Sequence, residues 1–255
     1  MDLSTVTYPA LIPNVPDWQY HEELTAPRGF FSSSLAKMAD RSCWKAALRP
    51  VKRTGPMTFG GCVHAFLDAK HKGCGVVGYY PADGNPDPAR GVKLPKADFA
   101  RANGCAEALL LDPASRPFLE NATETELTAL WMLDGVKCKC RLDVLTGLTI
   151  VDVKTTSSVE GDDFIRSANG LGYDLNAAHY LSGPFGFSRY IFIAVESNEP
   201  HDVRVYEYDQ ESLAAASKRL AELRSEFKKC LETREWPSYP REVTVMRSWR
   251  AGRSS

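Results

Sequence analysis

The sequence of 255 residues lacks the features that mark several large classes of protein. No apolar run approaches the roughly 20 residues that a membrane-spanning helix needs, and the first residues do not show the charged and then apolar pattern of a signal peptide. The seven cysteines include no C-x-x-C pair, which argues against a zinc site or a disulfide framework. We therefore expect a cytoplasmic protein that does not bind membranes.

The sequence also lacks an excess of positive charge. Its formal net charge at pH 7 is −1, whereas simple DNA-binding domains are often strongly basic. A hydrophobic content of 44% with 25% charged residues is ordinary for a globular protein. The length suffices for one sizeable core. We expect a single domain over residues 1–240, followed by a basic and mobile tail over residues 241–255.

The stretch from Cys140 to Thr156 (CRLDVLTGLTIVDVKTT) is the most informative part of the chain. Two runs rich in Val, Ile, Leu and Thr flank Thr146-Gly147, a pattern typical of a β-hairpin. If these two residues form the turn, Asp143 lies opposite Ile150 on the paired strand.

Two carboxylates and a lysine come together on one face of this hairpin. Side chains alternate along a strand, so Asp152 and Lys154 share a face, and the register adds Asp143 to it. The two acids become diagonal neighbours about 7–8 Å apart, an arrangement that can bind a hard cation such as Mg²⁺. A solvated strand face is the alternative. Ile150 lies beside the charges, however, and indicates a half-buried cleft, where like charges are costly without a cation.

These residues resemble a known family. Asp143, followed by Asp152, Val153 and Lys154, resembles the core motif of the PD-(D/E)XK nucleases. Several short segments, taken in their order along the chain, resemble the RecE-type phage and prophage exonucleases. They are TELTALW with Glu126, KCKCRLD, IVDVKTT, GYDLNAAHY at 172–180, FIAVE at 192–196 and WPSYP at 236–240. The resemblance covers residues 20–240 and implies an α/β fold with a restriction-endonuclease-like core, a small mixed sheet flanked by helices.

The resemblance implies further metal ligands. An acid at the position of Glu126 joins the metal ligands in the family, and Glu124 is the nearby alternative. The backbone carbonyl of Val153 is implied as another ligand. His64, on a helix that we expect to begin at Gly60-Gly61, is implied to line the metal site, although a lone helical histidine is more often a packing or capping residue.

The resemblance also extends to a helix expected from Tyr173 to Leu181. The family has a glutamine where this chain has Asn176, followed by the tyrosine that Tyr180 matches. Asparagine is one methylene shorter, so the active-site role of residue 176 is in doubt while the helix is not.

Lys154 is expected to orient the attacking water and to offset charge on the phosphate.

A basic stretch before this core could contact DNA. Ser32 to Ser34 supply the N-cap of a helix, and four basic residues that follow recur every four positions, so they should line one side of it: Lys37, Arg41, Lys45 and Arg49. A solvated helix face is the alternative. Beside a nuclease site, this stripe could bind phosphates.

The function that the resemblance implies is hydrolysis of DNA phosphodiesters from duplex ends with Mg²⁺, or with Mn²⁺ as a substitute, in phage-type recombination. The implied partners are a single-strand annealing protein and further copies of the chain in a homo-oligomer. An endonuclease of the same superfamily and a catalytically silent DNA-binding or scaffolding module remain as alternatives. An iron–sulfur variant of the superfamily does not fit, because only Cys230 lies late in the chain.

The remaining pattern predicts how the other elements follow one another. We expect a long surface loop over residues 73–96, a helix over residues 98–111 and a three-stranded meander over residues 126–156. Two helices, two strands and a long amphipathic helix should follow, over residues 161–170, 173–181, 189–196, 203–208 and 210–236.

Overall fold

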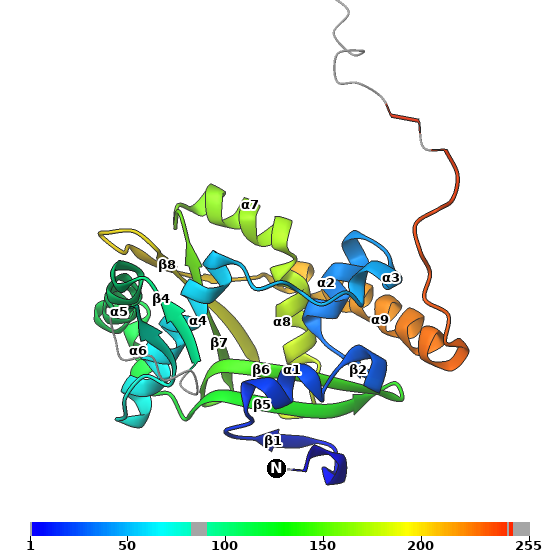
Figure 1. Ribbon diagram of the computed structural model, residues 1–255, viewed down its shortest axis with the longest axis horizontal. Coiled ribbons are helices and arrows are strands. Elements are labelled where there is room, and N and C mark those ends of the chain that lie inside the picture. Colours follow the sequence, from blue (N-terminus) through cyan, green and yellow to red (C-terminus); the bar gives the residue numbers. More distant parts are fainter. Residues whose placement is uncertain (1, 83–90, 244, 247–255) are drawn as a thin grey trace, which may run out of the picture.

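Figure 1 shows a computed structural model, which describes residues 2–82, 91–243, 245 and 246. Seven strands form one mixed sheet, and two more form a separate small sheet. The strands are β1 (Ala10–Ile12), β2 (Phe30–Phe31), β3 (Gly78–Pro81), β4 (Gly91–Leu94), β5 (Glu124–Leu133), β6 (Val136–Thr146), β7 (Thr149–Thr156), β8 (Arg189–Glu196) and β9 (Val203–Glu207).

Helices surround this sheet, which confirms the predicted α/β fold with a mixed sheet flanked by helices. None of those in the described part of the chain is long and apolar enough to cross a bilayer. The α-helices are α1 (Asp17–Glu22), α2 (Ser33–Arg41), α3 (Trp44–Ala47), α4 (Gly55–Lys72), α5 (Lys96–Leu111), α6 (Arg116–Glu120), α7 (Gly161–Leu171), α8 (Tyr173–Leu181) and α9 (Gln210–Thr233). Two 3-10 helices, η1 (Leu3–Thr5) and η2 (Ala26–Arg28), lie near the N-terminus.

The sheet has the strand order β1-β5-β6-β7-β8-β9, with β2 paired to β6. Strands β5, β6 and β7 form the predicted antiparallel meander, whereas β7 and β8 are parallel. A parallel pair needs a crossover connection, and α7 with α8 provides it. Figure 1 shows α4, α5 and α6 on one side of the molecule and α2, α8 and α9 on the other.

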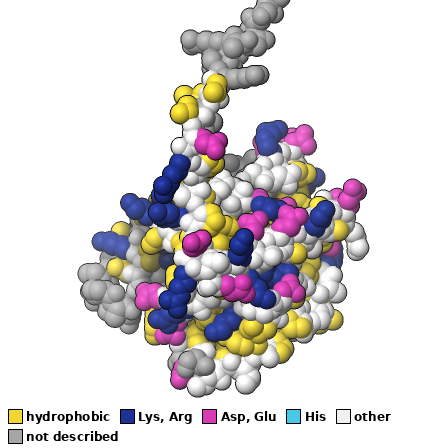
Figure 2. Space-filling view, turned by 90° about the vertical axis from the view of Figure 1, so that its right-hand side faces the viewer, with side chains coloured by type: hydrophobic (Ala, Val, Ile, Leu, Met, Phe, Trp, Pro, Cys, Tyr) yellow, Lys and Arg dark blue, Asp and Glu magenta, His cyan; other side chains and the backbone are white. Residues whose placement is uncertain are grey.

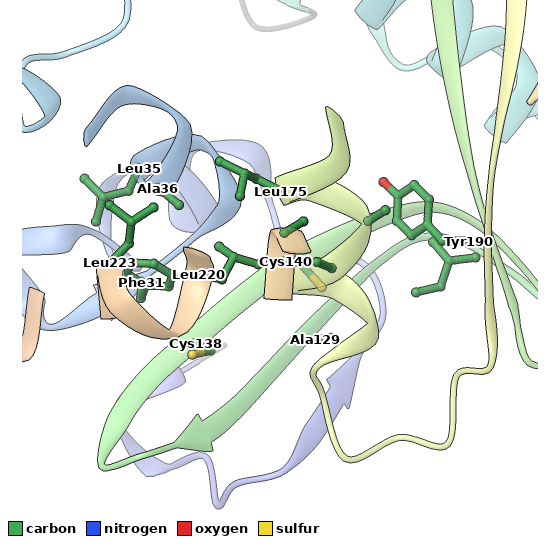
Figure 3. Packing of buried hydrophobic residues seen from close by; sticks show 14 of the residues in the cluster. Phe31, Leu35, Ala36, Ala129, Cys138, Cys140, Leu175, Tyr190, Leu220 and Leu223 are labelled. Carbon is green, nitrogen blue, oxygen red and sulfur yellow. The ribbon is translucent and has the colours of Figure 1, made fainter. Parts of the chain in front are cut away.

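Two large apolar clusters hold these layers together. One joins the sheet to α2, α8 and α9 and includes Phe31, Leu223 and Cys140. Figure 3 shows this cluster with Tyr190 at one end of it. The other cluster packs α4 and α5 against β7 and β8 through Val63, among others. Both faces of β7 are therefore covered, which explains why its apolar residues do not simply alternate with polar ones.

Strands β6 and β7 separate soon after their turn. They pair over only three positions: Val144 with Val151, Leu145 with Ile150 and Thr146 with Thr149. The turn is formed by Gly147-Leu148 and not by the predicted Thr146-Gly147, because Gly147 adopts a left-handed φ of 59°. Beyond these pairs the strands diverge, and α8 packs where they part. We call this divergence the fork.

The predicted basic stripe is not continuous, so the expectation of one helix was wrong. The helix begins as predicted, with the Ser32 hydroxyl accepting a hydrogen bond from the Leu35 N–H. It ends at Arg41, however, and α3 begins only at Trp44, whose buried indole ring sits against Phe227. Burial of this indole redirects the chain, and the basic side chains no longer follow one helix.

Two other expectations on the first half of the chain need correction. Helix α4 begins at Gly55, where Thr54 caps it, so Gly60-Gly61 lies inside the helix and not at its start. The expected loop over residues 73–96 contains β3 and β4, a parallel pair. Part of that loop, residues 83–90, lies outside the described residues, as does most of the predicted tail over residues 241–255.

Candidate active site

The fork aligns three acids on neighbouring strands. If the β6–β7 register continues by one more position past Val144, Asp143 lies directly opposite Asp152. The β5–β6 register places Glu126 opposite Asp143, since pairing continues on both sides of this position. Glu126 has a left-handed φ of 50°, an uncommon conformation for a residue with a side chain. The acids therefore form one row across β5, β6 and β7.

Side chains complete the edge of β7 that β6 leaves unpaired. The backbone N–H of Val153 donates to Asp143 Oδ2 at 3.0 Å, and the Val153 carbonyl accepts from His64 Nε2 at 2.9 Å. Buried backbone groups require such partners. The predicted histidine thus reaches the fork from α4 and contacts the carbonyl that was implied as a metal ligand.

Three of the predicted ligands converge at this point. His64 Nδ1 lies 3.9 Å from Glu126 Oε1, and His64 Nε2 lies 3.7 Å from Asp143 Oδ2. One ligand atom from each of these residues lies within 4.8 Å of the others, a spacing that could hold a metal ion. Glu124, the alternative acid, is exposed at the start of β5 and is not part of this group.

Asp152 lies beside this group but has other partners. Its Oδ2 accepts a hydrogen bond of 2.6 Å from the Tyr190 hydroxyl, and its Oδ1 pairs with the Lys154 ammonium. Asp152 is only 5% exposed. The carboxylate is thus held in one orientation next to Asp143.

Burial and proximity change the ionisation of these groups. Burial raises the pKa of Asp143 to about 7 and also raises the pKa of Glu126. Burial lowers the pKa of His64, but Asp143 and Glu126 outweigh this, so the pKa lies above its ordinary value. Two half-buried carboxylates that ionise with difficulty are typical of a site that binds a divalent cation.

For Asp152 and Lys154, in contrast, the neighbouring groups favour the charged forms. Burial would raise the pKa of Asp152, but Lys154 and the Tyr190 hydroxyl lower it below its ordinary value. Burial would lower the pKa of Lys154, but the two aspartates raise it above its usual range. The neighbouring aspartates therefore favour the charged form of Lys154.

Helix α8 completes the other edge of the fork. The Tyr180 hydroxyl donates to the Arg141 carbonyl at 3.0 Å, and His179 Nε2 lies 3.0 Å from the Lys139 carbonyl. Tyr180 also packs edge-on against Tyr190, which in turn holds Asp152. The structure thus places the predicted Tyr180 in contact with the backbone of β6 and one aromatic ring away from the acids.

Asn176 lies one turn earlier on α8 and is 7% exposed. Its Oδ1 is buried, and no group in the described part of the chain bonds to it. A buried amide oxygen normally has a partner. The shortened side chain that departs from the family pattern is thus one with unused hydrogen-bonding capacity.

Gly60 and Gly61 allow helix α4 to pack closely at this site. A Cβ at Gly60 would lie 3.2 Å from the Thr155 side chain on β7, and a Cβ at Gly61 would collide with the Tyr79 hydroxyl. Glycine inside a helix costs up to about 1 kcal/mol relative to alanine. Because glycine has no side chain, the helix, and His64 with it, can lie close to β7.

The four predicted phosphate-binding residues have separate positions. Lys37 is half-buried and lies over the ring of Tyr173, while Arg41, Lys45 and Arg49 are exposed. On the face drawn in Figure 2, Lys and Arg side chains are interspersed with Asp and Glu and form no single basic patch. Lys37 and the Arg41 guanidinium both reach the α7–α8 junction at Gly172, and Lys37 lies close enough to Asp152 and Lys154 for both to change its pKa.

The sequence reasoning missed two aromatic residues of the site. Tyr190 binds Asp152, and the ring of Tyr173 lies 5.3 Å from the Lys154 ammonium. The sequence pattern placed Tyr173 only at the start of an expected helix. The position of Tyr190 depends on the parallel pairing of β8 with β7, which places Tyr190 beside Ile150. Nothing in the spacing along the chain reveals which strands are neighbours.

Comparison with known proteins shows the family of this chain. A family model described as "PDDEXK-like domain of unknown function (DUF3799)" matches residues 31–248. No curated protein matches the chain. The family match confirms the predicted PD-(D/E)XK resemblance.

One of the similar solved structures has the same fold. A candidate exonuclease from Eubacterium rectale has a TM-score of 0.63 at 15% identity, with 92% of this chain and 96% of that chain covered. A phage-related exonuclease from Haemophilus somnus 129PT has a TM-score of 0.37 at 13% identity, with 85% and 98% covered. The first likeness confirms the predicted fold, and the second carries no argument at this score.

Proposed function

Because this chain belongs to the PDDEXK-like family, we propose that it is a metal-dependent nuclease that hydrolyses DNA phosphodiesters from duplex ends. The observation that carries the proposal is the convergence of His64, Glu126 and Asp143 within 4.8 Å at the fork, beside Asp152 and Lys154. The exonuclease described for the similar Eubacterium rectale structure supports the same activity.

The residues at the fork fit a divalent metal. Two carboxylates and an imidazole offer converging ligand atoms, and burial makes the uncompensated carboxylates costly. We assign the binding of Mg²⁺, or Mn²⁺ in its place, to these side chains together with Asp152 and the Val153 carbonyl. When bound, such a metal supplies a water of lowered pKa and stabilises the leaving oxygen.

The other side chains position the substrate and keep the site in shape. The Lys154 ammonium, whose charged form the neighbouring aspartates favour, would offset charge on the phosphate as it reacts. Tyr190 fixes the carboxylate of Asp152. Tyr180 supports Tyr190 and the backbone of β6, and Asn176 presents a free amide oxygen nearby.

We infer selectivity for DNA ends because the sequence shows no recognisable base-reading motif such as a C-x-x-C finger. Phosphate contacts position a protein on DNA without conveying sequence, so a free end is the simplest feature to select. The likeness of the sequence to RecE-type exonucleases further supports a role in phage-type recombination. It also supports a homo-oligomer, a single-strand annealing protein as partner, and one nuclease domain over residues 1–240.

The test compares linear duplex DNA with covalently closed circular duplex. With Mg²⁺, the protein should degrade the linear form while the circle survives, and EDTA should abolish the activity. Asp152→Asn keeps the shape of the side chain and should be inactive. Degradation of both forms at comparable rates would favour an endonuclease. Inertness with both Mg²⁺ and Mn²⁺ would favour a silent DNA-binding module.

A further inference from the structure

Lys37 occupies an unusual position beside the acids. It projects from α2 towards the junction of α7 and α8, where a Cβ at Gly172 would lie 3.1 Å from its Cγ. Gly172 has a left-handed φ of 65°, so a glycine there both permits the turn and leaves room for the lysine stem. The stem is thus guided past the junction, and its ammonium lies 5.7 Å from the centre of the Tyr173 ring.

A second ammonium shares this ring. Lys154 Nζ lies 5.3 Å from the centre of the same ring of Tyr173. An aromatic face attracts one cation by about 0.5–2 kcal/mol, but it cannot neutralise two. The two lysines come from α2 and β7, so tertiary packing alone places them together.

Lys37 has no anion of its own in the described part of the chain, where its ammonium forms neither an ion pair nor a hydrogen bond. Lys154 is paired with Asp152, which also accepts a hydrogen bond from Tyr190, and this carboxylate forms no ion pair with Lys37 in the described residues. Burial, and then repulsion by Lys154, lowers the pKa of Lys37 to about 8. A half-buried cation beside another cation is unfavourable until an anion joins them.

We propose that Lys37, Lys154 and the ring of Tyr173 form a subsite for a phosphate group of the substrate strand, in which Lys37 binds the non-bridging oxygens. The proposal rests on the proposed nuclease function and specifies how that site holds its substrate. A phosphate has several oxygens and can bridge two ammonium groups that otherwise repel each other.

The same reasoning separates Lys37 from the neighbouring basic residues. Lys45, which the sequence pattern grouped with it, is exposed on α3 and has no contact with the Tyr173 ring. Lys45→Gln therefore removes the same charge from the same region without touching the subsite. It is the matched control for Lys37→Gln.

The first experiment measures binding of a short linear DNA duplex in the presence of Ca²⁺, which takes the oxygen ligands that Mg²⁺ takes. Lys37→Gln should weaken binding about tenfold and should reduce the slope of log K against log salt by about one. Lys37→Arg should recover part of the affinity, while Lys45→Gln should stay within about twofold of the parent. An affinity and slope in Lys37→Gln equal to those of Lys45→Gln would overturn the subsite.

The second experiment does not depend on nuclease activity. Lysines are reductively methylated with ¹³C, the Lys37 signal is identified by its absence in Lys37→Gln, and inorganic phosphate is added in EDTA. The Lys37 signal should shift with phosphate and not with sodium chloride of equal ionic strength, while the Lys45 signal should not move. A Lys37 signal that does not respond to phosphate would contradict the subsite.

The two experiments separate the two proposals. A protein that cleaves no DNA but whose Lys37 signal responds to phosphate would keep the subsite and lose the nuclease function. A protein that cleaves linear DNA, with a Lys37→Gln variant that binds DNA as the parent does, would keep the nuclease function and lose the subsite.

Discussion

Strands β6 and β7 each lose a partner strand where they part, and side chains complete the two edges differently. On β7, Val153 is bonded by Asp143 and His64. On β6, two backbone carbonyls are bonded by His179 and Tyr180 of α8. The first edge uses an ionisable carboxyl and an ionisable imidazole that lie close to further acids, while the second uses groups that are neutral and packed among aromatic rings.

The difference shows how the fork separates function from stability. Burial raises the pKa of Asp143 to about 7, so its ionised form is unfavourable in the fold. Burial lowers the pKa of His179 to about 4, so this ring stays neutral and serves as a hydrogen-bond donor. We infer that the β7 edge costs stability, and that the β6 edge supplies it. Functional sites commonly carry such strain.

The largest expected effect concerns Asp143→Asn. Amide oxygen still accepts the Val153 N–H, but the metal loses a charged ligand, so the cleavage rate should fall by more than the ten- to hundredfold that is typical of losing a residue that only supports a ligand. The rate on linear duplex with Mg²⁺ measures this. A variant that cleaves at the parental rate would show that Asp143 is not a ligand.

Asp143→Asn should at the same time not weaken the fold. A folded pKa of about 7 lies above the unfolded value, so the contribution of Asp143 to the stability of the parent declines above the unfolded pKa and is lost as the pH rises through 7. In EDTA at pH 8, the variant should therefore unfold at the same urea concentration as the parent or at a higher one. A clearly lower midpoint would mean that the β7 edge is structural after all.

His179→Phe tests the β6 edge. The ring keeps its place between Trp131 and Phe31, but the Lys139 carbonyl loses its donor. Leaving a buried carbonyl unpaired should cost about 1–3 kcal/mol in the free energy of unfolding. Urea denaturation at pH 7.5 measures the loss. A variant as stable as the parent would show that the His179 hydrogen bond contributes nothing.

The pH dependence of stability provides a separate test of His179. Its folded pKa of about 4 lies below the unfolded value, so the unfolded state binds more protons and the parent loses stability as the pH falls from 6.5 towards 4. This contribution amounts to at most about 1.4 kcal/mol per pH unit. The difference in unfolding free energy between parent and His179→Phe should shrink over that range. A constant difference would contradict a buried neutral ring.

The smallest effect should come from Tyr180→Phe. Loss of the hydroxyl leaves the Arg141 carbonyl partly exposed to water, so the cost should be about 1 kcal/mol. The ring still packs against Tyr190, so cleavage should stay within a few fold of the parent. Urea melts and cleavage rates check both. A loss of activity as large as that of Asp143→Asn would make Tyr180 part of the chemistry.

Much of the row of acids could be predicted from local pattern. Side chains alternate along a strand, so Asp152 and Lys154 share a face in any register. The predicted register of β6 and β7 was two residues off, because the turn lies at Gly147-Leu148. A shift by two keeps every side chain on its face, so Asp143 still joined Asp152.

The sequence by itself thus determined which strand face carries the acids and where most helices and strands lie. Tertiary structure decided what meets that face: the parting of β6 and β7, the approach of His64 on α4, and the parallel neighbour that brings Tyr190 to Asp152. It also broke the predicted basic helix at Trp44 and left Lys37 close to Asp152 and Lys154. The physical reason is that alternation and capping depend on residues a few positions apart. Unpaired strand edges and buried charges are completed by groups that only packing brings near.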